Sequence, residues 1–271
     1  MKRYVGVLGM LLAVGSARAD LVVTGTEVVK DRTGASQGER ERKVYISPRG
    51  IRVDSEGESH ILDARNGLMI EVDHRKKTAR VITFKQLGEM TEIARKEADE
   101  AVARAQKELS SMPPNVRAQV EDAIRLQRRA QAARQKGAYK RTATGKKRTV
   151  NGFACEEVKE TLNDEWVGTS CVHRGVKLSE GDRHMLQKLA KDMADAGVSG
   201  DDGGFTRAFL DGIPVEMAVV DQRSGQLKVE ERVTRVESVP VSEALFDVPQ
   251  GYTTQTWDGA GPHLGKHKDK H

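Results

Sequence analysis

The sequence predicts an α+β fold, in which an antiparallel sheet is interrupted by an inserted pair of helices. Residues 21–84 form short runs of alternating apolar and polar side chains, with turn residues at a spacing of about 8 to 12. Between 85 and 137 the apolar residues recur every three or four positions, which is the period of a helix. Parallel strands need crossover helices, and no helical pattern separates the early strands, so we expect an antiparallel sheet.

The first part of the sheet is expected to be a meander of short strands. The polar segment Gly34–Arg42 is expected to be a loop, Pro48-Arg49-Gly50 a turn and Asn66-Gly67 a tight hairpin turn. The expected strands are Leu21–Val29, Lys43–Ser47, Ile51–Val53, Ser59–Leu62, Leu68–Val72 and Ala79–Phe84.

Two helices are expected in the inserted region 85–137. The apolar face of the first consists of Leu87, Met90, Ala94, Ala98, Ala101, Ala105 and Leu109. Pro113-Pro114 ends this helix, because proline lacks an amide proton and restricts the residue before it. A second helix runs from Asn115 to Lys136 and ends at Gly137. We expect the two helices to form an antiparallel hairpin that a short linker can replace without loss of the sheet.

Both cysteines lie in Asn151–Val172, where two alternating strands flank a turn at Asn163 and Asp164. A pairing centred on Asn163 places Cys155 opposite Cys171, close enough for a disulfide. The alternative is a pair of free thiols in a reducing compartment. The N-terminus favours the disulfide, because it indicates export.

Residues 1–19 resemble a secretory signal peptide. Lys2 and Arg3 precede the apolar run Tyr4–Val14, and Ala17-Arg18-Ala19 is typical of a cleavage site. We expect cleavage after Ala19 and a periplasmic location, with no transmembrane helix in the mature chain. No cysteine follows the cleavage site, so a lipid anchor is not indicated.

The second part of the chain continues the α+β pattern. Ser179 is expected to cap a helix that extends to Ala196. Its apolar face consists of Met185, Leu186, Leu189 and Met193. Strands are expected at Ile213–Val219 and Leu227–Val239, and Phe246-Asp247-Val248-Pro249 closes the domain.

Charge argues against nucleic acid as a partner. Loss of residues 1–19 removes three basic residues and no acidic ones, so 42 basic residues face 40 acidic ones and the formal charge falls from +5 to +2. The region between Ala123 and Val150 nevertheless contains no acid. It is either a solvated basic face or a patch for anionic lipid or another envelope polyanion, formed by Arg125, Arg128, Arg129, Arg134, Lys140, Arg141, Lys146, Lys147 and Arg148.

Motifs for catalysis or cofactor binding do not occur, so we expect a non-enzymatic protein without a cofactor. His263, His267 and His271 repeat every four residues and would chelate a metal if the tail were helical. Glycine and proline in residues 258–271 argue against a helix, so we expect a disordered tail with adventitious metal affinity.

Three groups of segments resemble a known family. They are Tyr45-Ile46-Ser47 with Gly50-Ile51-Arg52-Val53-Asp54 and Ile61-Leu62-Asp63, then Gly212-Ile213-Pro214-Val215-Glu216, and finally Phe246-Asp247-Val248-Pro249-Gln250-Gly251-Tyr252. Together they are similar to an uncharacterised bacterial periplasmic domain family related to the LolA/LolB lipoprotein carriers. The resemblance implies a single LolA-like domain over residues 20–257, with a curved, incomplete barrel, covering helices and an apolar cavity between them. It implies no catalytic residues.

Two classes of function follow from these features. The first is a periplasmic binding or carrier protein that holds a lipid or other apolar ligand, with Met185, Leu186, Leu189 and Met193 lining its pocket. The alternative for these four residues is that they fill an ordinary core. The second is a structural or interaction protein of the cell envelope, which binds an envelope protein or an anionic lipid surface through its helical arm and basic patch.

Overall fold

The computed structural model describes residues 20–31, 34–134, 139–162, 165–197, 206, 208–220 and 227–256. The signal peptide predicted at residues 1–19 and the tail predicted at 258–271, with His263, His267 and His271, lie outside the described residues.

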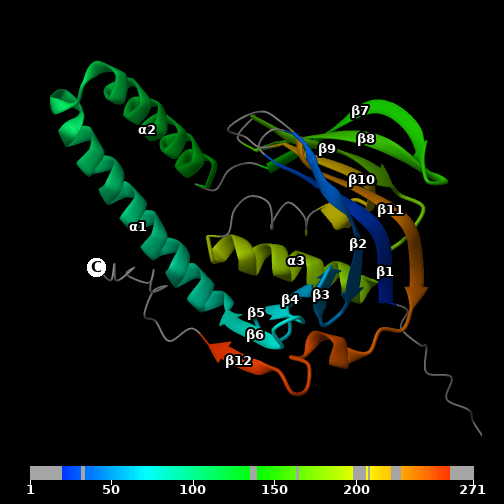
Figure 1. Ribbon diagram of the computed structural model, residues 1–271. Coiled ribbons are helices and arrows are strands. Elements are labelled where there is room, and N and C mark those ends of the chain that lie inside the picture. Colours follow the sequence, from blue (N-terminus) through cyan, green and yellow to red (C-terminus); the bar gives the residue numbers. More distant parts are fainter. Residues whose placement is uncertain are drawn as a thin grey trace, which may run out of the picture.

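The strands form one large curved sheet (Figure 1). They are β1 (Asp20–Lys30), β2 (Ser36–Ser47), β3 (Gly50–Ser55), β4 (Glu58–Asp63), β5 (Leu68–Asp73), β6 (Thr78–Thr83), β7 (Tyr139–Val150), β8 (Phe153–Leu162), β9 (Glu165–His173), β10 (Ile213–Val220), β11 (Leu227–Val239) and β12 (Thr253–Thr256). Their order is β12-β6-β5-β4-β3-β2-β1-β11-β10-β9-β8-β7. All neighbours are antiparallel except β12 and β6, which are parallel. The sheet is not closed into a barrel, so the predicted fold class is confirmed.

The first strand joins two meanders into this one sheet. β1 pairs with β2 on one side and with β11 on the other, although β11 lies some two hundred positions later in the chain. β6 and β7 therefore lie toward opposite ends of the strand order, and the helices between them carry the chain across (Figure 1). The expectation that a short linker can replace these helices has no support from this order, because the ends to be joined are not neighbouring strands.

Residues 36–42 are a strand and not the predicted loop. They extend β2 along the full length of β1, with Lys30 opposite Ser36 and Thr26 opposite Glu41. Polarity suggested a loop, but strand pairing with β1 satisfies the backbone while the polar side chains stay largely accessible.

The inserted region contains α1 (Phe84–Glu108), a short 3-10 turn η1 (Leu109–Ser111) and α2 (Pro114–Arg134). A capping box starts α1, in which the Gln86 amide donates to Thr83 Oγ1 at 3.1 Å and the Thr83 amide donates to Gln86 Oε1 at 2.9 Å. α1 then leads away from the sheet and α2 turns back (Figure 1). Phe84, at the start of α1, is its one buried residue. None of the helices in the described part of the chain is long and apolar enough to span a membrane.

Apolar residues form two clusters on the sheet. The larger cluster lies beneath α3 (Glu180–Asp195), which sits in the hollow of the curved sheet (Figure 1). The smaller one involves Ile61, Ile70, Val72 and Ala79 of β4–β6, and Phe246 of the 3-10 turn η2 (Glu243–Phe246) covers it. The sheet thus has apolar side chains on more than one side. α3 packs on the larger cluster, and Phe246 of η2 packs on the smaller one.

Cys155 and Cys171 form a disulfide with a Cα–Cα distance of 5.4 Å, so the predicted bond is present. The predicted pairing was wrong, however. Leu162 lies opposite Glu165, and a register shift between Glu160 and Thr161 places Cys171 opposite Glu157. The disulfide therefore joins diagonal neighbours of β8 and β9, which still lie within reach of each other.

Replacement of both cysteines by alanine is expected to destabilise the protein by about 3 kcal/mol, because the bond closes a loop of about 15 residues in the unfolded chain. Thermal and urea unfolding of the oxidised protein and of the double variant measures this difference. Identical stability would show that the β8–β9 hairpin persists in the unfolded chain, and it would contradict the expected loss.

Candidate functional site

α3 is positioned by its first turn and by one lysine. The Asp182 amide donates to Ser179 Oγ at 3.1 Å, which caps the helix as the sequence predicted. Near the middle of the helix, Lys188 Nζ donates to the carbonyl oxygen of Ala64 at 2.9 Å and also contacts Asp192. Lys188 thereby ties α3 to the turn between β4 and β5.

One face of α3 is completely covered by the sheet. Met185, Leu186, Leu189 and Met193 are between 0% and 3% exposed. They belong to the larger cluster, whose other members include Leu21, Val23, Val44, Ile46, Ile51 and Phe209. The four residues predicted to line a ligand pocket thus lie together, in contact with an apolar sheet surface in this structure.

A small hollow of about 30 Å³ lies near the middle of the sheet, beside Phe209, Val23 and Pro214. Its volume is close to that of one water molecule. At its edge Arg42 lies between Glu27 and Glu231, and burial lowers the pKa of the Arg42 guanidinium while Glu27 acts in the opposite direction. The apolar interior is therefore bordered here by charged side chains.

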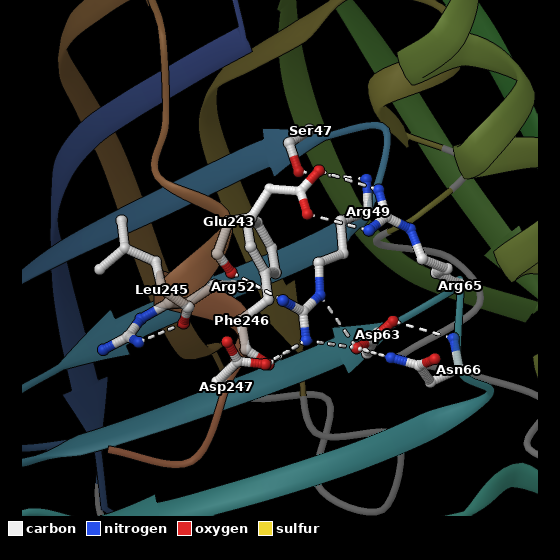
Figure 2. Close-up of polar contacts among 10 residues, drawn as sticks. All are labelled: Ser47, Arg49, Arg52, Asp63, Arg65, Asn66, Glu243, Leu245, Phe246 and Asp247. Carbon is white, nitrogen blue, oxygen red and sulfur yellow. Dashed lines mark hydrogen bonds and ion pairs between the residues drawn. The ribbon is translucent and has the colours of Figure 1, made fainter. Parts of the chain in front are cut away.

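A second polar site, which we call the arginine cluster, consists of Arg49, Arg52 and Asp63 (Figure 2). Arg49 Nε donates to Asp63 Oδ2 at 3.1 Å, and the Asp63 side chain is fully buried. The remaining donors of Arg49 reach the carbonyl oxygens of Glu243 and Phe246 and the carboxylate of Asp247 (Figure 2). The hydrogen bonds to Asp247 and Asp63 raise the pKa of Arg49. Arg49 thus fastens the residues around Phe246 to the sheet.

Arg52, which lies in β3 three residues after Arg49, makes the same kind of connection. Its guanidinium donates to the Leu245 carbonyl oxygen and, at 3.0 Å, to Ser59 Oγ. Ser59 Oγ also lies 2.7 Å from His74 Nε2, whose Nδ1 lies 2.9 Å from the Tyr252 hydroxyl. These contacts tie the chain at both ends of residues 245–252 to the sheet.

This serine–histidine pair is not arranged for catalysis. Ser59 is fully buried and its hydroxyl donates to Asp54 at 2.6 Å, so it is neither accessible nor directed at a substrate. In the described part of the chain, no group of three histidine, cysteine or acidic side chains is placed to hold a metal ion.

Sequence reasoning missed the arginine cluster. Arg49 lies in the predicted turn, but nothing in the local pattern shows that its side chain is nearly buried. The available signal was the position of Arg52 and Asp63 in strands that are otherwise apolar, because charged residues at such positions are rarely buried without a partner.

The structure describes the side chains of six of the nine residues in the predicted basic patch. Arg141 is buried by Glu160 and Asp211, so it cannot contribute to an exposed patch. The other described members are accessible, but Arg125 pairs with Asp122, Lys146 with Glu157 and Arg148 with Glu216. Lys140 and Lys147 are exposed on β7, and the side chains of Arg128, Arg129 and Arg134 lie outside the described residues.

The family described as "Domain of unknown function (DUF4412)" matches residues 115–252, which is half of the chain. The chain belongs to this family. The DUF4412 match includes α2, α3, the β8–β9 hairpin and the segment that carries Phe246, whereas Arg49, Arg52 and Asp63 lie before it. Two of the three segment groups on which the resemblance rested fall within the DUF4412 region.

Several solved structures share low similarity with this DUF4412 protein, while no curated protein matches it in sequence. A putative outer membrane lipoprotein-sorting protein domain from Vibrio parahaemolyticus is 9% identical, with a TM-score of 0.35 and coverage of 86% of this chain and 91% of that one. MucB is 13% identical, with a TM-score of 0.31 and coverage of 88% and 60%. PNGF-II is 6% identical, with a TM-score of 0.39 and coverage of 88% and 32%. The chain thus spans less than two thirds of MucB and of PNGF-II.

Proposed function

We propose that this protein is a non-enzymatic periplasmic binding or carrier protein for a lipid or other apolar ligand, which is held between the sheet and α3. The supporting observation is that α3 places a continuous apolar face, from Met185 to Met193, in the hollow of a sheet that is not closed. The predicted signal peptide supports the periplasmic location. Cofactors and nucleic acid have no part in this function.

The ligand enters when α3 moves away from the sheet, because the space beneath α3 is filled. Exposing the four apolar side chains costs roughly 6 to 12 kcal/mol, at about 1.5 to 3 kcal/mol for each. A buried methylene group contributes about 0.8 kcal/mol, so an acyl chain of about 12 carbons offsets this cost. Long acyl chains are therefore favoured over small apolar molecules.

Replacement of Lys188 by methionine tests this function. The change removes the hydrogen bond to the Ala64 carbonyl oxygen, so α3 leaves the sheet more readily. Hydrogen bonds to charged groups contribute about 1.5 to 3 kcal/mol, and we therefore expect a fluorescent fatty acid to bind about tenfold more tightly or better. Titration of the fluorescent ligand measures the affinity.

Lys191→Met is a matched control. Lys191 pairs with Asp195 as Lys188 pairs with Asp192, but it is largely exposed and its ion pair lies within the helix. It is expected to leave the affinity unchanged. No saturable binding by any of the three proteins, or equal gains in both variants, would contradict a site beneath α3.

The second candidate is an interaction protein of the envelope that acts through α1 and α2. It is favoured by the direction of α1 away from the sheet and by two exposed apolar side chains, Ile93 at 44% and Val116 at 39% (Figure 1). An anionic lipid surface is one partner of this class. Arg125 and the basic residues that follow it in the sequence would bind this surface. Flotation with phosphatidylglycerol vesicles, compared with a variant in which Arg125, Arg128, Arg129 and Arg134 are glutamine, tests this candidate.

A further inference from the structure

A hollow of about 440 Å³ opens beside the β7 end of the sheet and is lined by more basic than acidic residues. The basic residues in its lining are Lys147, Arg148 and Arg174, and the acidic one is Glu156. Ala154, Cys155 and Val172 complete much of the remaining wall. Its volume falls within the range of about 300 to 1,000 Å³ that is typical of ligand pockets.

Strand register explains why these residues meet. Lys147 lies opposite Glu156, and Glu156 lies opposite Val172 on the next strand, so the three side chains share one face of β7, β8 and β9. A register shift in β7 between Ala143 and Lys147 sets this alignment. Arg174 follows directly after β9 and its guanidinium pairs with Glu156. Lys147 and Arg174 thus lie on either side of a single carboxylate.

Positive charge at this hollow exceeds negative charge. Arg148 shares the carboxylate of Glu216 with Arg232, whose Nε lies 3.3 Å from it. Among the described residues, Arg174 is the one base that pairs with Glu156, and Lys147 has no ion pair. Two basic side chains, those of Lys147 and Arg174, therefore accompany the single carboxylate of Glu156, which leaves an excess of one positive charge. Arg148, the next residue of β7, points to the opposite face of the sheet, where it pairs with Glu216.

We propose that this hollow binds a phosphate group, carried either by a lipid headgroup or by a free anion. Inorganic phosphate has a charge of roughly −1.5 to −2 and a phosphodiester headgroup has a single negative charge, and the oxygens of either can accept charge-assisted hydrogen bonds from both Lys147 and Arg174. The ligand displaces Glu156 in part from Arg174 and pairs with Lys147. This site is separate from the apolar face of α3, so its test does not depend on the apolar ligand.

Two variants change phosphate binding in opposite directions. The double variant Lys147→Gln, Arg174→Gln is expected to bind inorganic phosphate about tenfold more weakly or worse, because two charge-assisted contacts are lost. Glu156→Gln is expected to bind it more tightly, because the competing carboxylate is removed. The side chains of Lys147, Arg174 and Glu156 are all accessible, and thermal unfolding verifies that the variants are folded. Isothermal titration calorimetry of the full chain measures the affinity for inorganic phosphate.

Lys146→Gln is the control, since Lys146 adjoins Lys147, pairs with Glu157 and does not line the hollow. Saturable binding of inorganic phosphate that follows these variants identifies a free anion as a ligand. Binding to phosphatidylglycerol vesicles but not to phosphate, with the same dependence on Lys147 and Arg174, identifies a lipid headgroup. The proposal is overturned if neither probe binds, if Glu156→Gln does not increase the affinity, or if Lys146→Gln weakens binding as much as the double variant.

Discussion

Replacement of Phe246 by alanine is expected to lower the free energy of unfolding by about 3 to 5 kcal/mol, the range observed for large buried aromatic side chains. Phe246 is completely buried and covers Ile61, Ile70 and Val72 of the sheet. The Arg49 guanidinium carbon also lies 5.9 Å from the centre of its ring. Urea unfolding followed by circular dichroism measures the loss.

Leu245→Ala is the matched control for Phe246→Ala. Leu245 precedes Phe246 and packs against the same cluster, but it is only partly buried. Its truncation is expected to cost less than half as much. A loss for Phe246→Ala no larger than that for Leu245→Ala would mean that residues 241–252 are a loose cover and not part of the folded unit.

Replacement of Asp63 by asparagine is expected to cost about 3 to 5 kcal/mol, because it leaves the nearly buried Arg49 guanidinium without its buried counter-charge. Asparagine keeps the size of the side chain, so the loss reports charge and not a cavity. The Asp63 carboxylate also accepts hydrogen bonds from the Asn66 amide at 3.0 Å and from Asn66 Nδ2 at 2.8 Å. Chemical unfolding at neutral pH measures the change.

Asp247→Asn provides the comparison, since Asp247 pairs with the same guanidinium while its side chain is 57% exposed. An exposed partner contributes at most about 1 kcal/mol. Equal effects of Asp63→Asn and Asp247→Asn would contradict the view that burial determines the contribution of each carboxylate. The effects of Asp63→Asn and Phe246→Ala are expected not to add, because both residues contact Arg49.

Local features of this protein were readable from the sequence. Alternation of apolar and polar residues identified most strands, Ser179 predicted the start of α3, and the disulfide followed from two cysteines in one hairpin. The apolar residues of α3 were placed on one face, and they are buried on one face. Such features depend on residues within a few positions of one another, and short-range patterns are therefore sufficient to predict them.

Long-range features were decided by the tertiary structure. A single extra residue near Trp166 shifts the β8–β9 register, and alternation alone does not reveal it. Burial of Arg49 depends on carbonyl groups almost two hundred positions away, at Glu243 and Phe246. The pairing of β1 with β11 likewise joins the two ends of the domain. Sequence therefore determined most of the elements and the apolar face of α3. Strand order, register and the buried arginine cluster were decided by contacts between distant residues, which no local pattern records.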